Sequence, residues 1–114
     1  MMKTGLMAVA NFEAGQIWRL KEADKINNFD AVVLLVETLN AEEIVHIALI
    51  DRSGQLVVGH MPFARPAFTA SIESLVGYAN SLIDYEEGYN IWRSAYDAGD
   101  AGIFGVKISD CAVV

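Results

Sequence analysis

His46 and His60 are the two histidines of this 114-residue chain, and their side chains suit metal binding or proton transfer. Residues 43–50 and 55–60 are apolar runs joined by a turn-forming Asp-Arg-Ser-Gly segment, which predicts a β-hairpin. In that hairpin His46 lies opposite about Gly59 or His60, so we expect neighbouring imidazoles. The carboxylates that could complete a site are Asp51, Glu43 and Glu13. The more common role of a strand histidine is structural, and we expect no preformed metal site.

Other catalytic motifs are absent from the sequence. The glycines near residues 15 and 99–105 lack the spacing and context of a phosphate-binding loop, and no nucleophile elbow or paired-cysteine metal motif is present. The single cysteine, Cys111, has no partner for an internal disulfide, which fits a reducing compartment. The sequence therefore indicates no cofactor and identifies no catalytic residue.

Aromatic residues provide a second set of candidates. A helix starting near residue 84 would present one aromatic stripe, formed by Tyr85, Tyr89, Trp92 and Tyr96. Trp18 lies on a predicted strand. We take Trp18, Tyr89 and Trp92 as candidate residues for binding a ligand or partner, because tryptophan and tyrosine are favoured at binding surfaces. Packing against a sheet is the commoner role of such a stripe.

Three carboxylates mark the start of the same helix. Asp84 and Glu87 have the spacing of a capping box, and Glu86 lies between them. Their negative charge favours the helix dipole, which is a sufficient structural reason for them. A basic partner would provide a functional one.

The elements that must position these side chains form an α+β fold, with an antiparallel sheet of about five strands covered by two C-terminal helices. Pro62 is expected to end the strand that contains His60. One helix is expected to start near Pro66 and continue to Ile83, with Phe68, Ile72, Leu75 and Val76 on its buried face. The other is expected to end at Gly99. The expected strands are 14–21, 30–37, 43–50, 55–60 and 103–108. The second and third are expected to form a central hairpin with a five-residue turn, covered because both of its faces are apolar, and a polar loop at 22–28 leads into it. All 114 residues form a single domain.

Charge and hydropathy limit the partners. Fifteen acidic against eight basic residues give a formal net charge of −7, which disfavours binding to nucleic acids and anionic membranes. The apolar stretch after Lys3 is too short for a signal peptide, and no segment has the length of a membrane span. We therefore expect an acidic, soluble, cytoplasmic protein. Basic residues Arg19, Lys21 and Lys107 would guard the sheet edges, so a homodimer is expected to form through side chains.

Several short motifs resemble a family of short bacterial cytoplasmic proteins without an established activity. The motifs are Gly15-Gln-Ile-Trp18, Ile44-Val-His-Ile47, His60-Met-Pro62, Glu86-Glu-Gly-Tyr89 with Trp92, and Ala101-Gly-Ile-Phe104. Here Lys21-Glu-Ala-Asp24 replaces the Arg-Pro-Gly-Glu-like loop of the family. The resemblance implies a small cytoplasmic α+β domain and implies no reaction.

These observations favour a non-enzymatic protein-interaction module, of an accessory or immunity type, that uses its acidic surface or an aromatic groove. The alternative is a small enzyme or a metal- or ligand-binding protein with a site around His46 and His60. A pocket that holds both histidines would favour the alternative.

Overall fold

The computed structural model describes residues 11–21, 28–81 and 83–111. Its five strands are β1 (Gln16–Leu20), β2 (Asp30–Leu39), β3 (Glu42–Ile50), β4 (Leu56–Ala64) and β5 (Ile72–Tyr78). They form one antiparallel sheet in the order β4-β3-β2-β1-β5. The helices are α2 (Arg65–Ser71), α3 (Glu86–Asp97) and the 3-10 turn η3 (Ile108–Asp110). The expected α+β class with a five-stranded antiparallel sheet is confirmed.

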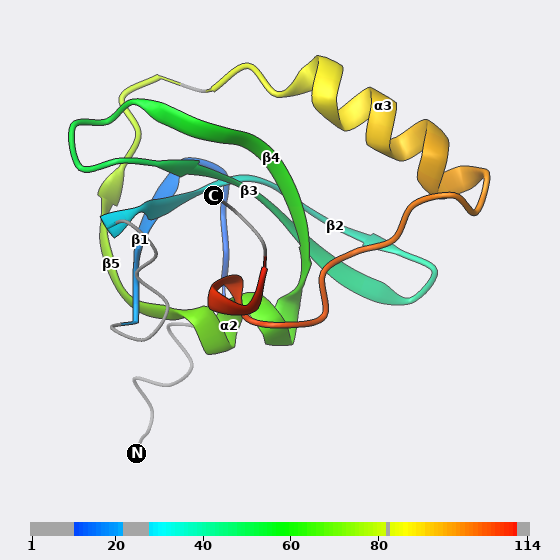
Figure 1. Ribbon diagram of the computed structural model, residues 1–114, viewed down its shortest axis with the longest axis horizontal. Helices are drawn as coiled ribbons and strands as arrows, with labels where there is room; N and C mark the ends of the chain where they lie inside the picture. The colour runs from blue at the N-terminus through cyan, green and yellow to red at the C-terminus, as the bar shows by residue number, and fades with distance from the viewer. Residues whose placement is uncertain (1–10, 22–27, 82, 112–114) are drawn as a thin grey trace.

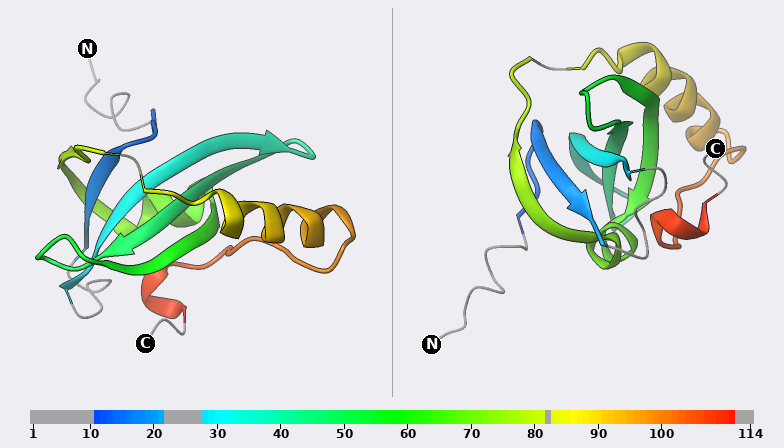
Figure 2. Two further views of the ribbon diagram at one scale, coloured as in Figure 1. Left: turned by 90° about the horizontal axis from the view of Figure 1, so that it is seen from above. Right: turned by 60° about the vertical axis from the view of Figure 1, so that its left-hand side comes forward.

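The sheet is strongly curved, and α2 joins its two edge strands, β4 and β5, across one end (Figures 1 and 2). Helix α3 lies beside the far half of the β2–β3 hairpin, away from α2 and η3 (Figure 2). None of the helices formed by the described residues is long and apolar enough to cross a membrane.

The β2–β3 hairpin is the centre of the sheet, as expected, but its turn is tighter than the predicted five-residue connection. Only Asn40 and Ala41 separate the strands, and both have positive φ angles, 52° and 65°. Two consecutive left-handed residues are the hallmark of the type I′ hairpin turn, whose twist matches that of the strands. Asparagine tolerates this conformation better than most residues.

One face of the sheet packs on α2 and η3 and forms the main core. It carries Val45, Ile47 and Leu49 of β3, each with no exposed surface, together with Trp18 of β1 and Phe63 of β4. Phe68 of α2 and Ile108 of η3 close this core, and both are fully buried.

The alternate residues of β3, Ile44, His46 and Ala48, are also buried, on the opposite face. Both faces of the central strand are therefore covered, as predicted.

The predicted helix from Pro66 to Ile83 is wrong beyond Ser71. The chain turns into β5 at Ile72 and pairs with the outer edge of β1. This pairing satisfies backbone N–H and C=O groups of β1 that would lack partners if β5 were helical. Phe68 and Ile72 are buried as predicted, but Leu75 and Val76 are 40% and 45% exposed. The apolar spacing of residues 72–78 is compatible with a helix, but the segment forms a strand because it pairs with β1.

The predicted end of β4 at Pro62 and the predicted strand at 103–108 are also wrong. Strand β4 continues to Ala64, and the Pro62 carbonyl oxygen accepts a hydrogen bond from the Phe104 amide at 2.8 Å. Proline is tolerated because β4 is an edge strand and its missing N–H would point outward. Around Phe104 the expected strand is reduced to one parallel bridge to Phe63.

The predicted guarding of a sheet edge by Arg19 and Lys21 is wrong as well. Strand β1 lies between β2 and β5, so Arg19 is inside the sheet and pairs with Asp30 at 2.9 Å. The edges are β4 and β5. The polar loop expected over residues 22–28 falls almost entirely outside the described residues.

Candidate functional site

His46 and His60 are neighbours, as the sequence predicts. Nδ1 of His46 lies 2.9 Å from Nε2 of His60, and the two rings stack with their centroids 5.0 Å apart. Nε2 of His46 lies 2.7 Å from Oε2 of Glu37. Glu37, His46 and His60, called here the histidine cluster, thus form a continuous hydrogen-bonded chain across β2, β3 and β4.

The strand register explains the proximity, although it differs from the predicted one. His46 lies opposite Pro62, so His60 is its diagonal neighbour. A register shift between Val33 and Leu35 inserts an extra residue into β2. Such a bulge changes which face the following side chains occupy, and it places Glu37 on the face of His46. The carboxylate partner is Glu37, whereas the sequence suggested Asp51, Glu43 or Glu13.

Burial keeps both imidazoles neutral near pH 7. The His46 side chain has no exposed surface, and this burial lowers its pKa despite the nearby Glu37 carboxylate. The pKa of His60 is lowered to about 4 by burial and by the adjacent His46. Because the Glu37 carboxylate only accepts hydrogen bonds, neutral His46 carries its proton on Nε2, and its Nδ1 accepts from His60.

Helix α3 is attached to this cluster by its aromatic stripe. The Tyr89 hydroxyl donates to the Glu37 carboxylate, 2.9 Å from Oε2, and accepts from Nη1 of Arg93 at 3.0 Å. The Trp92 ring contacts the His46 ring edge-on, with centroids 5.0 Å apart. Its Nε1 donates to the Gly102 carbonyl oxygen at 2.9 Å. Tyr89 and Trp92 therefore pack on the sheet, the commoner of the two roles expected for the stripe.

The helix contributes no fully buried residue, so polar and aromatic contacts carry much of its attachment. At its C-terminal end, the Tyr96 ring stacks on Trp92 with centroids 4.9 Å apart, and its hydroxyl accepts from Nδ2 of Asn40 at 3.0 Å. The helix ends at Asp97 with Ala98 as its C-cap, and Gly99 follows with a φ of 82°, the left-handed residue that stops the helix as predicted. The predicted Asp84–Glu87 capping box does not form: Asp84 Oδ1 instead accepts from the Glu86 amide at 3.2 Å.

The histidine cluster is arranged as a chain and not as a ring of ligands around one point. Both nitrogens of His46 are engaged within the protein, one with Glu37 and one with His60. Among the described residues, no group of three or more His, Cys, Asp and Glu side chains could hold a metal ion. The cluster is suited to moving a proton along its length and to fixing α3.

Trp18, another candidate from the sequence, does not lie in this cluster. It is 4% exposed in the main core, and its Nε1 donates to Gln16 Oε1 at 3.0 Å. Cys111 is partly buried and has a raised pKa because of that burial, so its thiol is protonated at neutral pH.

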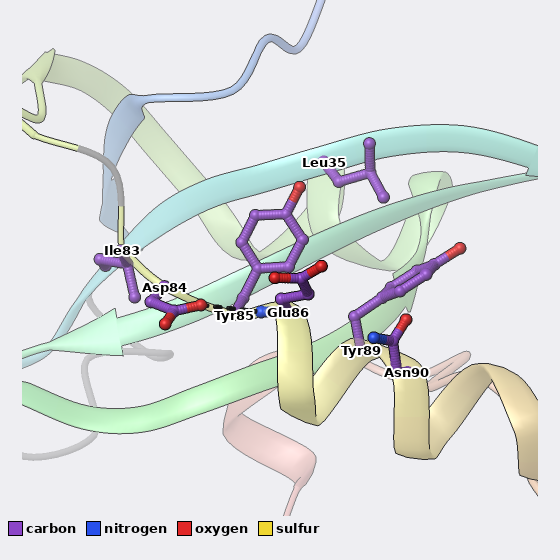
Figure 3. A pocket seen from close by; sticks show the side chains of 7 residues that line it. All are labelled: Leu35, Ile83, Asp84, Tyr85, Glu86, Tyr89 and Asn90. Atoms are coloured by element: carbon purple, nitrogen blue, oxygen red, sulfur yellow. Dashed lines mark hydrogen bonds between the residues drawn. The ribbon is translucent and has the colours of Figure 1, made fainter.

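Two hollows lie beside the N-terminal half of α3. The first, called here the tyrosine pocket, has a volume of about 440 Å³ and includes Tyr85 and Tyr89 in its wall (Figure 3). The rest of its lining is Leu35, Ile83, Asp84, Glu86 and Asn90. The second has about 410 Å³ and is lined by Asp84, Glu86, Glu87, Asn90 and Ile91. Within the part of the chain that the structure describes, neither lining includes a histidine or a basic residue.

Glu37 and Arg93 are the members of this region that sequence reasoning missed. A two-residue turn at Asn40–Ala41 would have placed Glu37 diagonal to His46, so the signal for Glu37 was present in the hairpin. Arg93 follows Tyr89 by one helical turn, a spacing that allows side-chain contact.

No family model, curated protein or solved structure matches the chain. Three of the short motifs noted in the sequence nevertheless meet in one place. His46 comes from Val-His-Ile on β3, His60 from His-Met-Pro on β4, and Tyr89 and Trp92 from the α3 motif. Their rings lie within 6.2 Å of one another, centroid to centroid.

Proposed function

We propose that the protein is a non-enzymatic interaction module that binds a basic protein partner through the surface around the N-terminal half of α3. The observation that carries this proposal is the pair of adjoining hollows at that surface. Asp84 and Glu86 line both hollows, Glu87 joins them in the second, and no Lys or Arg is among the described residues of either lining. In a chain with a net charge of −7, this surface attracts a positively charged partner.

The aromatic lining strengthens the proposal. Tyr85 and Tyr89 are half-buried, so part of each ring faces outward beside the carboxylates. Ile91 in the second hollow is 66% exposed. Apolar and aromatic surface next to charged groups is typical of protein-binding sites, in which aromatic contacts give affinity and charges give selectivity.

The alternative, a reaction or metal centre at His46 and His60, has less support. His46 is fully buried, and neither histidine is among the described residues that line the two hollows beside α3. The cluster instead connects β2, β3 and β4 to α3 through Tyr89 and Trp92. Its role in the proposed function is to hold α3 in position.

The test compares two variants with the same change in net charge. The first replaces Asp84, Glu86 and Glu87 by Asn, Gln and Gln. The control replaces Glu13, Glu42 and Glu73 by Gln, since these exposed residues lie away from the hollows. Each protein is used to capture partners from a lysate of the native host, and the partner identified by mass spectrometry is purified for affinity measurement.

The α3 variant should bind that partner about tenfold or more weakly, from three partly exposed ion pairs at a few tenths to 1 kcal/mol each. The control variant should bind within about twofold of the original protein, because its charges are remote from the site. An equal loss of affinity in both variants would mean that only the net charge matters. An unchanged affinity in the α3 variant would mean that the partner binds at another surface. Either result contradicts the proposal.

A further inference from the structure

The tyrosine pocket has two aromatic faces set almost at a right angle. The Tyr85 and Tyr89 rings have centroids 6.4 Å apart and an interplanar angle of 85°. In the view of Figure 3, the Glu86 side chain lies between the two rings, and Leu35 of β2 lies above them. Tyr89 is fixed by its hydrogen bond to Glu37, so this wall of the pocket is held by the sheet. Two crossed aromatic faces form part of a cage for a cation.

The charged residues that the structure describes in the pocket lining, Asp84 and Glu86, are both acidic. Asp84 and Glu86 are exposed at its rim. One oxygen of Asp84 accepts from the Glu86 amide at 3.2 Å, and none of the described residues hydrogen-bonds to the second. A bound cation would therefore meet a free carboxylate oxygen beside the aromatic faces. An anionic ligand would be repelled from the same position.

The remaining wall of the pocket is aliphatic. Leu35 and Ile83 are half-buried in the lining, where they offer contact to a hydrocarbon chain. A volume of about 440 Å³ is enough for one long amino-acid side chain. This lining matches the chemistry of an alkylammonium group. The aromatic faces and carboxylates suit its charged end, and the aliphatic surface suits its methylene stem.

We propose that the tyrosine pocket binds the side-chain ammonium group of a lysine in the protein partner. This inference rests on the proposed function and specifies which group of the basic partner is recognised. In this proposal the Tyr85 and Tyr89 rings contact the ammonium cation, and the Asp84 and Glu86 carboxylates balance its positive charge. Leu35 and Ile83 contact the methylene stem.

The experiment titrates the 114-residue protein with Nα-acetyl-lysine amide and follows backbone amide shifts by NMR. The uncharged analogue, with Nε also acetylated, is the matched control, and n-butylammonium chloride is the probe for a free amine. The variants are Tyr85→Phe, which keeps the aromatic face, and Tyr85→Leu, which keeps apolar volume only. A circular-dichroism melt of each variant establishes that it is folded.

The lysine derivative should shift the amides of residues 83–90 in a saturable manner, and the Nε-acetylated analogue should not. Tyr85→Phe should keep the affinity within about twofold, whereas Tyr85→Leu should weaken it by roughly threefold or more. Asp84→Asn with Glu86→Gln should weaken it by roughly fivefold. Shifts scattered over the surface, or equal affinities for Tyr85→Phe and Tyr85→Leu, would overturn the inference.

The two proposals fail in different ways. If the captured partner depends on the acidic residues but the lysine derivative leaves residues 83–90 unshifted, the pocket assignment is wrong and the interaction function stands. If n-butylammonium binds much more tightly than the lysine derivative, the pocket takes a free amine, and the assignment to a partner's lysine is wrong.

Discussion

At the scale of single residues, Glu37 connects the sheet to α3. Its carboxylate accepts hydrogen bonds from the buried His46 and from Tyr89, and Arg93 lies 3.7 Å from its second oxygen. A β-bulge places it there, because uninterrupted alternation from Val33 would direct it toward the main core. Glu37 thus holds the helix that carries the proposed binding surface.

Replacing Glu37 by alanine should leave the buried His46 N–H without an acceptor. The expected cost is about 1–3 kcal/mol in the free energy of unfolding, the usual penalty for an unsatisfied buried polar group. Glu42→Ala is the control, since Glu42 is exposed at the hairpin end and should change stability by no more than about 0.5 kcal/mol. Urea denaturation measures both, and equal effects would contradict the role assigned to Glu37.

The histidines should make stability depend on pH. The pKa of His60 is about 4 in the folded protein, below the ordinary value of 6.5, and that of His46 is also lowered. Between those values the unfolded chain binds more protons, so stability is complete above about pH 6.5 and falls as the pH drops toward 4. The groups facing the imidazoles are Glu37 of β2, and Tyr89 and Arg93 of α3.

The measurement is the melting temperature between pH 7.5 and 5.0, a window that limits the contribution of carboxylates. The original protein should lose more than His60→Gln over this range, because the variant has no imidazole to protonate at this position. Parallel curves for the two proteins would show that His60 does not couple protonation to folding.

At the scale of secondary-structure elements, the segment after α2 departs most from the sequence-based expectation. Phe68 is fully buried in α2, whereas Leu75 is 40% exposed on β5. Phe68→Ala should therefore cost about 3–5 kcal/mol, and Leu75→Ala less than about 1 kcal/mol. Chemical-denaturation midpoints decide between the two arrangements. A cost above 2 kcal/mol for Leu75→Ala would fit the long helix instead of β5.

Short-range sequence patterns predicted those elements that do not depend on pairing with distant parts of the chain. The β2–β3 hairpin, β1 and α3 follow from apolar alternation, turn residues and the aromatic stripe. Residues 72–78 could not be assigned in this way, because their apolar spacing also fits a helix and their strand conformation depends on pairing with β1. The strand predicted around Phe104 failed for the same reason, since its pairing with β4 stops after one bridge.

The candidate site shows the same limit. The nearness of His46 and His60 follows from a hairpin, so it could be predicted. Glu37 lies diagonal to His46 because the Asn40–Ala41 turn has two residues, where the expected strands left five, and the Val33–Leu35 bulge behind it has no clear sequence signature. The tyrosine pocket forms where β2 meets the segment before α3, a long-range contact that periodicity does not report.

At the scale of the whole molecule, the open sheet leaves β4 and β5 as edges. Strand β5 exposes Leu75, Val76 and Tyr78, at 40%, 45% and 60%. The homodimer expected from the sequence stays a prediction. Sedimentation equilibrium at micromolar concentration should give a mass above the 12.4 kDa of one chain, and a mass of 12.4 kDa throughout would contradict it.

Exposed carboxylates occur both at α3 and at remote positions such as Glu13, Glu42 and Glu73. The proposed function therefore requires that the partner contacts the carboxylates at α3 and not the remote ones. Carbodiimide cross-linking joins carboxylates directly to lysine amines and identifies the carboxylates in contact. After cross-linking the protein to its captured partner, mass spectrometry should find Asp84, Glu86 and Glu87 joined to the partner's lysines. Cross-links found only at remote carboxylates such as Glu13, Glu42 or Glu73 would contradict binding at α3.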